Sequence, residues 1–374
     1  MNMKQWGNRL LILCLALWIL LGGFLLLLPP YESFSHRENR TLAQAPALRA
    51  DTIWSGTFSK DVQKFCADQF PLRSFFVSLS AYSELAFGKG ERNGILFARE
   101  GFLIPRGEHT DFSVLTQNLN AIRSFREISP VPVSTLLIPR HIDALAHLLP
   151  SGYSTERAAL IPNTVLHHSK SLLFPIKEWQ GKSDYYYKTD HHLTTEGAYA
   201  AYRLLGESLG YPPKEESYFE PVTVSQSFLG TSYSSAGGIS FAKDSVTLYR
   251  YLNDDRFTVS VNSAEPSLKG FYREEFLKMK DHYSIFLGGN YAHLTVTDPL
   301  EKKPHLLLIK DSFANALIPF LAIHFDLTVY DLRYRSDVSF GDLSDYDHVL
   351  IVQGLETLAT DSSLRNLPTA LLTK

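Results

Sequence analysis

Residues 301–325 read EKKPHLLLIKDSFANALIPFLAIHF and join an apolar run to a helical pattern. The run at 305–309 has the length of a buried strand, and the apolar spacing over 313–324 predicts a helix. Ser312 lies where the strand gives way to this helix. A hydroxyl at such a turn lies among free backbone N–H groups and near the positive end of the helix dipole, which suits a nucleophile whose product is an oxyanion. Pro319 should kink the helix about two turns after Ser312.

Helical and strand patterns alternate on both sides of this stretch. We expect helices over 111–127, 156–171 and 195–209, strands over 131–138, 327–330 and 348–353, and a tyrosine-rich strand or loop at 184–188. The helix at 195–209 has a capping residue, Thr194, and ends at Gly210. The alternation predicts an α/β fold, a parallel sheet with helices on both faces. The chemistry of such sheets lies beyond the carboxyl ends of the strands, where Ser312 is expected.

Three further segments differ from this pattern. Residues 57–87 predict one or two amphipathic helices broken at Pro71, and residues 92–105 predict a hairpin. Short runs rich in Val, Thr, Tyr and Phe over 217–297 predict a β-rich insertion between the α/β units. Three domains are therefore expected. Residues 1–30 would form a cytoplasmic N-terminus with a transmembrane anchor, and residues 31–105 a juxtamembrane linker with N-terminal helices and a hairpin. Residues 106–374 would form an α/β domain with the β-rich insertion.

An apolar stretch near the N-terminus has membrane-spanning length. Residues 10–28 carry no charge, and Lys4 and Arg9 precede them. Positive charge before the span predicts a cytoplasmic N-terminus and an extracytoplasmic body, which makes this a single-pass membrane protein. A cleaved signal peptide is the alternative, although the stretch is long for one and no small-x-small cleavage site follows it.

The composition excludes several classes of protein. The 374 residues are 45% hydrophobic, enough for one large core, and they balance 36 basic against 39 acidic residues. This balance gives no electrostatic reason to expect a nucleic-acid partner. Cys14 lies in the apolar stretch and Cys66 stands alone, so no disulfide between them is expected. Zinc-type cysteine spacing and glycine-rich phosphate loops do not occur, and we expect neither a metal nor a cofactor.

A serine nucleophile needs a base that is itself held by a third group, and one segment offers both. Asp190, His191 and His192 directly precede the helix at 195–209. In an extended segment Asp190 and His192 would share one face, so that the carboxylate holds the imidazole whose other nitrogen reaches Ser312. His191 would point the opposite way. The spacing therefore favours His192 as the base.

Other interpretations of these residues stay open. Asp311 and Ser312 are also what an ordinary helix N-cap looks like. The Asp-His-His run could cap its helix, bind a metal or simply pack, although no third and fourth metal ligand lies near it. Arg140 and Arg333 follow expected strands, where they could bind an anion or form structural salt bridges.

Several short motifs together resemble a known family. Three of them, Asp190-His191-His192, Lys310-Asp311-Ser312-Phe313 and Asp331-Leu332-Arg333-Tyr334, resemble the DHHW protein family. That family is similar to the alginate O-acetyltransferase proteins with SGNH-hydrolase-like domains. Smaller matches follow in the same order and extend the resemblance over nearly all of the chain after the anchor: 38–40, 68–73, 93–94, 228–231 and 287–290.

The resemblance implies an SGNH-hydrolase-like α/β domain with a Ser-His-Asp triad. Carried over by position, Ser312 is the nucleophile, His192 the base and Asp190 its orienting group. Backbone N–H groups at Ser312 and Phe313, with Gly289 and Asn290, would form the oxyanion hole; His191, Arg140 and Arg333 would contact substrate. One residue departs from the family name, because Leu193 stands where a Trp is expected, and a change there would alter substrate choice if that Trp lines a sugar-binding surface.

The resulting functional hypothesis is a membrane-anchored, extracytoplasmic O-acyl(acetyl)transferase or esterase. Its substrate would be a cell-envelope or exported polysaccharide, with a sugar hydroxyl or water as acyl acceptor. The alginate system implies a partner, a multi-pass membrane O-acyltransferase that moves acyl groups across the bilayer. The alternative is a non-catalytic carbohydrate-binding or assembly protein of an exopolysaccharide system, and a metal-dependent hydrolase is a third hypothesis.

Overall fold

The computed structural model describes residues 3–26, 28–29, 31–35, 40–107, 110–168, 172–262, 267–334 and 339–368. The chain divides into two units, residues 1–89 with 237–239 and residues 90–236 with 240–374. The predicted domain boundaries at residues 30 and 105 stay a proposal. Glu38 and Asn39, which belong to one of the smaller motif matches, lie outside the described residues.

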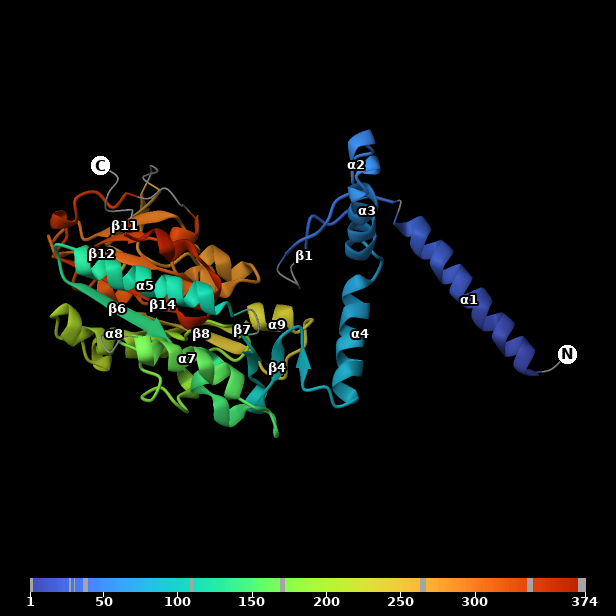
Figure 1. Ribbon diagram of the computed structural model, residues 1–374, viewed down its shortest axis with the longest axis horizontal. Coiled ribbons are helices and arrows are strands. Elements are labelled where there is room, and N and C mark those ends of the chain that lie inside the picture. The colour runs from blue at the N-terminus through green and yellow to red at the C-terminus, as the bar shows by residue number, and fades with distance from the viewer. Residues whose placement is uncertain are drawn as a thin grey trace. The chain divides into compact units, whose positions relative to one another are not determined.

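The first unit begins with the apolar helix α1, Met3–Leu25 (Figure 1). Its segment Trp6–Leu25 spans 20 residues with a mean hydropathy of 2.0, long and apolar enough to cross a membrane. A signal sequence has the same length and composition, so both alternatives remain. Aromatic side chains pack on the second half of α1, since the ring centroid of Trp18 lies 5.2 Å from that of Phe70 and 5.9 Å from that of Phe76.

Short elements complete this unit: β1 Phe34–Ser35, β2 Arg40–Thr41, α2 Ala50–Trp54, α3 Thr57–Asp68 and α4 Arg73–Ala86. The predicted break at Pro71 falls between α3 and α4. The guanidinium of Arg40 donates to both carboxylate oxygens of Asp68, and the backbone N–H of Ala43 donates to one of them. Two of the smaller motif matches thus meet in one ion pair that holds the unit together.

The second unit is built on a seven-stranded sheet with the order β10-β9-β11-β13-β12-β14-β6. Four strands, β13, β12, β14 and β6, run parallel, and β11, β9 and β10 continue the sheet antiparallel. Their bounds are β6 Val133–Ile138, β9 Thr258–Val261, β10 Leu268–Lys269, β11 His293–Thr297, β12 His305–Lys310, β13 Asp326–Tyr330 and β14 His348–Gly354. The strand that precedes Ser312 therefore lies inside the parallel part of the sheet.

The β-rich segment 217–297 differs from the prediction. Only β7 Glu220–Phe228 and β8 Asp244–Arg250 form a separate antiparallel ladder. The strands β9, β10 and β11 join the main sheet, so this sheet is mixed rather than wholly parallel. β11 pairs with β13, β9 with β11 and β10 with β9. Burial of apolar residues such as Val259 and Val296 stabilises this extension of the sheet.

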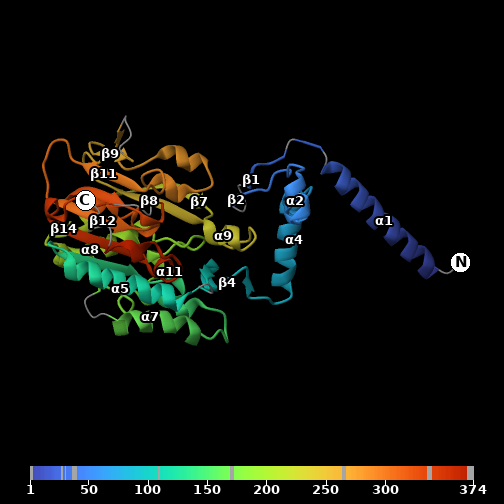
Figure 2. The ribbon, with the colours of Figure 1, turned by 45° about the horizontal axis from the view of Figure 1, so that its top comes forward.

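Helices cover both faces of the sheet, as predicted. They are α5 Phe112–Ile128, α6 His141–Ala144, α7 Glu156–His168, α8 Thr195–Leu209, α10 Ile318–Leu321 and α11 Leu355–Thr360. The short α9 Thr231–Ser235 contacts the strand Leu103–Pro105 instead. Leu306 and Leu308 of β12 face one core cluster together with α8, whereas Leu307 and Ile309 face a second cluster with α5, α7 and α11. In Figure 2, α11 lies beside α5. Alternate side chains of one strand thus enter two cores.

Single 3-10 turns connect these elements: η1 Arg99–Gly101, η2 Ala146–Leu148, η3 Ser183–Tyr185, η4 Glu216–Tyr218, η5 Glu274–Lys278, η6 His282–Ile285, η7 Ser312–Ala314, η8 Leu332–Tyr334, η9 Leu343–Asp345 and η10 Ser363–Asn366. The predicted hairpin is present as β4 Ile95–Phe97 and β5 Leu103–Pro105, extended by β3 Glu91–Arg92 into a three-stranded sheet. The capped helix at 195–209 is confirmed, with Thr194 accepting from the Gly197 N–H and Gly210 in the left-handed conformation.

The helix predicted over 313–324 is not continuous. Ser312 opens the 3-10 turn η7, and the short α10 follows it with Pro319 in its first turn. Because proline has no N–H to donate to the carbonyl four residues earlier, the chain starts a new helix there instead of continuing one. Ser312 is therefore followed by one tight turn, and the prediction that it faces a long helix dipole was wrong.

Candidate active site

The end of β12 is tied to its neighbour by Asp311. One carboxylate oxygen accepts from the N–H of Phe313 at 3.0 Å, and the other accepts from the N–H of Gly354 at 2.8 Å. The side chain is fully buried, and burial raises its pKa. Asp311 thus caps the turn at Ser312 and anchors it to the end of β14, the structural role that the sequence left open.

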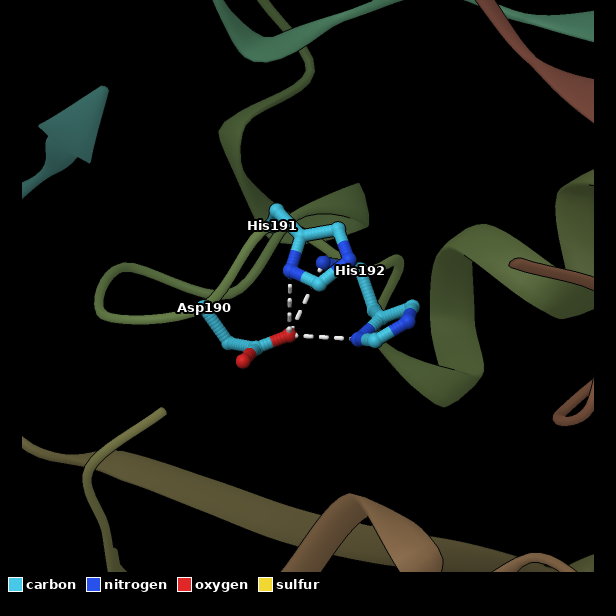
Figure 3. Close-up of side chains that lie close together, drawn as sticks. All are labelled: Asp190, His191 and His192. Atoms are coloured by element: carbon cyan, nitrogen blue, oxygen red, sulfur yellow. Dashed lines mark hydrogen bonds and ion pairs between the residues drawn. The ribbon is translucent and has the colours of Figure 1, made fainter. Parts of the chain in front are cut away.

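The predicted orienting group, Asp190, accepts four hydrogen bonds, and Figure 3 shows it beside His191 and His192. One oxygen accepts from the backbone N–H of His192 at 3.0 Å and from its Nδ1 at 2.6 Å. The other accepts from the backbone N–H of Thr231 at 2.8 Å and from its hydroxyl at 3.0 Å. Burial acts to raise the pKa of Asp190, but the adjacent imidazoles and these donors outweigh it and hold the pKa well below its usual range.

His191 does not point away from its neighbours, which corrects the expectation for an extended segment. Its ring centroid lies 3.9 Å from that of His192, and its Nδ1 lies 2.6 Å from the Thr231 hydroxyl. The hydrogen bond from the His192 N–H to the Asp190 side chain bends the backbone, as aspartate does in turns, and brings both rings to one side. Because the Thr231 hydroxyl donates to Asp190, it accepts from His191, which places a proton on His191 Nδ1.

His192 lies against two aromatic rings. Its ring stacks on Tyr283 with centroids 3.9 Å apart, and the Phe313 centroid lies 5.4 Å away. The Tyr283 hydroxyl in turn donates to the carbonyl oxygen of Ser312 at 2.9 Å. His192 Nε2 is buried and has no hydrogen-bond partner among the described residues, so it makes none with Ser312. The fold brings the two segments together, and the triad itself stays a prediction.

A second polar network lies at the end of β12. The Lys310 ammonium donates to Asn290 Oδ1 at 3.2 Å and to Asn315 Oδ1 at 2.6 Å, and it lies 3.6 Å from Asp331. Asn315 Nδ2 donates to Asn290 Oδ1 at 3.0 Å and to the carbonyl oxygen of Gly289 at 3.3 Å. Two of the predicted oxyanion-hole residues, Gly289 and Asn290, thus belong to a network with Lys310 and Asn315. These two residues lie before and after the turn that begins at Ser312.

A cavity of about 800 Å³ opens beside His191 and Phe313, and all of its lining residues come from the second unit. Its wall includes two predicted substrate-binding residues, His191 and Arg333, together with Phe313, Thr231 and Glu356. Arg333 pairs with the buried Asp331 through two hydrogen bonds of 2.7 and 2.9 Å, so its charge is partly compensated. Polar and charged groups therefore surround a space that is large enough for a sugar unit.

Two predicted positions have structural roles instead. Arg140 is buried, and its guanidinium donates to Asp143 at 2.6 and 2.7 Å and to the carbonyl oxygen of Ala158 at 2.9 Å. This is the structural salt bridge that the sequence allowed as the alternative to anion binding. Leu193 is 1% exposed and packs in the core, so the residue at this position forms no open sugar-binding surface here.

The Asp190, His191 and His192 side chains could also be considered as metal ligands, since one ligand atom from each lies within 4.8 Å of the others. Both carboxylate oxygens and both Nδ1 atoms already hold hydrogen bonds. Only the two Nε2 atoms remain, which is fewer than the three protein ligands of a typical catalytic zinc site. The donor set fits a hydrogen-bonded acid–histidine pair better than a metal centre.

Sequence reasoning missed several residues that complete the site. Thr231 and the adjacent Gly230 hold Asp190, and a Cβ on Gly230 would lie 2.2 Å from a carboxylate oxygen. The motif match at 228–231 was the signal for these two residues. Tyr283 had no signal at all, because a stacked tyrosine in an irregular segment has no recognisable spacing.

Residues 168–331 match the DHHW protein family. The match confirms the resemblance read from the motifs, and this DHHW segment contains the Asp190 cluster, Tyr283, the Lys310 network and Ser312. No match was found among curated proteins.

Similar solved structures include a member of the same family. A DHHW family protein from Eubacterium siraeum is similar with a TM-score of 0.61 and 21% identity, over 76% of this chain and 98% of that one. Bacillus cereus PatB1, solved with a sulfonyl adduct, gives a TM-score of 0.58 and 20% identity, over 72% of this chain and 97% of that one. The O-acetyltransferase domain of Pseudomonas putida AlgJ gives a TM-score of 0.44 and 11% identity, over 74% of this chain and 99% of that one. At these identities the first two likenesses show a shared fold.

Proposed function

We propose that this protein is a membrane-anchored, extracytoplasmic O-acyl(acetyl)transferase or esterase with an SGNH-hydrolase-like domain. Ser312 is the nucleophile, His192 the general base and Asp190 its orienting group. The observation that carries the proposal is the buried pair of His192 and Asp190, joined at 2.6 Å. Nε2 of His192 has no hydrogen-bond partner among the described residues, and the His192 ring lies 5.4 Å from that of Phe313, the residue after Ser312. A base that is held on one nitrogen and open on the other is what an activated serine requires.

The reaction proceeds in two steps. His192 Nε2 takes the proton as Ser312 Oγ bonds to the acyl carbon, and the carbonyl oxygen becomes an oxyanion. The proton then passes to the departing alcohol, which leaves an acyl-enzyme. A sugar hydroxyl or water attacks this ester in the second step, gives its proton to His192 and releases Ser312. Catalytic hydrogen bonds are often long in the unliganded state, so the His192–Ser312 contact forms as the acyl group binds.

The cavity next to His191 supports a carbohydrate as the acyl acceptor. Its wall combines polar groups such as Thr231, Glu356 and Arg333 with the ring of Phe313, the mixture that binds sugar hydroxyls and sugar faces. A polymer of the cell envelope or an exported polysaccharide is accessible to a body held outside the membrane by α1. The acyl donor would be supplied by a multi-pass membrane O-acyltransferase.

Covalent labelling tests the nucleophile. The full-length protein in detergent is treated with phenylmethanesulfonyl fluoride, because PatB1 has been solved with a sulfonyl adduct. Peptide mass spectrometry should find the adduct on Ser312, and turnover of 4-nitrophenyl acetate should fall to background in Ser312→Ala. Ser134→Ala is the matched control, since Ser134 also pairs with a histidine, His348 at 3.0 Å, but at the opposite end of the strands. Ser134→Ala should keep full turnover.

A non-catalytic carbohydrate-binding protein is the second candidate function. It is favoured by the missing hydrogen bond between His192 Nε2 and the Ser312 hydroxyl. Equal turnover by wild type and Ser312→Ala, with no adduct on Ser312, would leave this second function in place of the first.

A further inference from the structure

The orientation of the Asn290 amide is set by its neighbours. An amide has one end that accepts hydrogen bonds and one that donates them. Asn290 Oδ1 accepts from Lys310 at 3.2 Å and from Asn315 at 3.0 Å, which uses both of its acceptor positions. No hydrogen bond among the described residues uses Asn290 Nδ2, so its two N–H groups face away from this network.

Lys310 decides this orientation because an ammonium group can only donate. Its side chain is fully buried at the end of β12, two residues before Ser312. It holds the Oδ1 atoms of both Asn290 and Asn315, and Asn315 lies three residues after Ser312. An Asn290 amide turned the other way would place its N–H2 against the Lys310 ammonium and the Asn315 N–H2, and Lys310 would lose one of its buried acceptors, which is unfavourable.

We propose that Lys310 is a positioning residue of the site, whose ammonium group fixes Asn290 so that the Asn290 N–H2 donates to the oxyanion formed at Ser312. The inference rests on the proposed function and assigns the part of the site that stabilises the developing negative charge.

The charged groups around Lys310 are consistent with a fixed ammonium. Asp331, at the end of β13, lies 3.6 Å away, and Arg333 bonds to the same carboxylate. Asp311, on the same strand end as Lys310, also acts on it electrostatically. Asp331 therefore faces two cations, Lys310 and Arg333, and Asp311 is a second acidic group close to both.

A double-mutant cycle with 4-nitrophenyl acetate tests this inference on the full-length protein. Lys310→Met keeps the length of the side chain and removes its charge and donors; it should lower kcat on the order of a hundredfold, with little change in KM. Asn290→Ala should cost about as much. If Lys310 acts through Asn290, the double variant should be little worse than Asn290→Ala alone. Losses that multiply in the double variant would overturn the inference.

Two further variants separate positioning from folding. Lys303→Met is the matched control, because Lys303 is also buried and paired, with Asp298 at 3.0 Å, but lies before β12 and away from the site. It should lower the melting temperature and leave kcat unchanged. Asn290→Asp keeps an acceptor for Lys310 and loses the N–H2, so it should stay folded and lose kcat as Asn290→Ala does. A fully active Asn290→Asp would overturn the inference even if Lys310→Met fails to fold.

The outcomes also distinguish this inference from the proposed function. Turnover that does not depend on Ser312 would overturn both. Turnover that depends on Ser312 but is unaffected by Lys310→Met would overturn the inference alone.

Discussion

The imidazole of His192 lies flat on the phenol ring of Tyr283, with ring centroids 3.9 Å apart and 7° between the planes. The same tyrosine donates its hydroxyl proton to the carbonyl oxygen of Ser312 at 2.9 Å. One side chain therefore contacts both the proposed base and the backbone of the proposed nucleophile. It sets the separation between two segments that are about one domain apart in the sequence.

Tyr283→Phe should lower kcat about tenfold, because the ring still supports His192 while the Ser312 carbonyl loses a buried donor worth about 1 kcal/mol. Tyr283→Leu, which also removes the stacked ring, should lose considerably more. Turnover of 4-nitrophenyl acetate measures both. Tyr211→Phe is the control, since Tyr211 is also buried and donates to a backbone carbonyl, that of Tyr202 at 2.6 Å, outside the site. Equal losses in Tyr283→Phe and Tyr211→Phe would contradict a role specific to the site.

Gly230→Ala should displace the Asp190 carboxylate from its hydrogen bonds with Thr231. The added Cβ would lie 2.2 Å from a carboxylate oxygen, so Asp190 must move and lose its hydrogen bonds to Thr231. We expect turnover to fall on the order of a hundredfold or more, with a lower melting temperature. Gly90→Ala is the matched control, because its nearest neighbour is 3.9 Å from the added Cβ. Normal turnover in Gly230→Ala would argue against Asp190 as the orienting group.

The pH dependence of kcat should show the loss of the proton from Lys310. Burial lowers the pKa of Lys310 from 10.5 to about 8, with Asp331 acting in the opposite direction. The proposed positioning needs the protonated form, so kcat should fall as the pH rises through about 8. Lys310→Met should remove this decline and leave a lower, flatter profile. An unchanged alkaline limb in Lys310→Met would count against the assignment.

The same group predicts the opposite trend in stability. Between about pH 8 and 10.5 the unfolded chain holds more protons at Lys310 than the folded chain does. The free energy of unfolding contributed by this group therefore rises with pH across that window. Urea unfolding at pH 7.5 and 9.5 gives the change in the free energy of unfolding between the two pH values for each protein. The increase with pH should be larger in the wild type than in Lys310→Met.

Removal of metal ions distinguishes a serine mechanism from a metal-dependent one. The Asp190 cluster retains only two free ring nitrogens, so exhaustive dialysis against a chelator should leave turnover unchanged. Phenylmethanesulfonyl fluoride should abolish it in the same sample. A loss of activity on dialysis that zinc restores would reassign Asp190, His191 and His192 as metal ligands.

The parts of the fold that could be predicted are those set by local patterns. Strand β12 and the capped helix α8 follow from apolar runs and from the signals at Thr194 and Gly210, and the structure agrees with both. The continuous helix predicted over 313–324 from apolar spacing is not present. Pro319 lies in the first turn of a separate short helix, because a proline cannot donate the backbone hydrogen bond that a continuous helix needs there. Local chemistry at one position outweighed the period of the whole segment.

The site was harder to predict because its contacts join distant segments. The spacing of Asp190 and His192 gave the right pair, but the turn that brings His191 beside them depends on a side-chain hydrogen bond to the backbone. Thr231, Tyr283 and Asn290 lie on segments with no catalytic pattern of their own. Tertiary contacts of this kind have no period in the sequence, so only the resemblance to a family indicated some of them.

The segment 217–297 has a practical consequence for anyone who trims this protein to a smaller catalyst. A version cut back to the helices and parallel strands would keep Asp190, His192 and Ser312 in its sequence. It would lose Thr231, which holds the acid, Tyr283, which supports the base, and Asn290, the proposed donor to the oxyanion. Such a miniaturised protein would contain all three proposed reacting groups but would lack three of the side chains that position them.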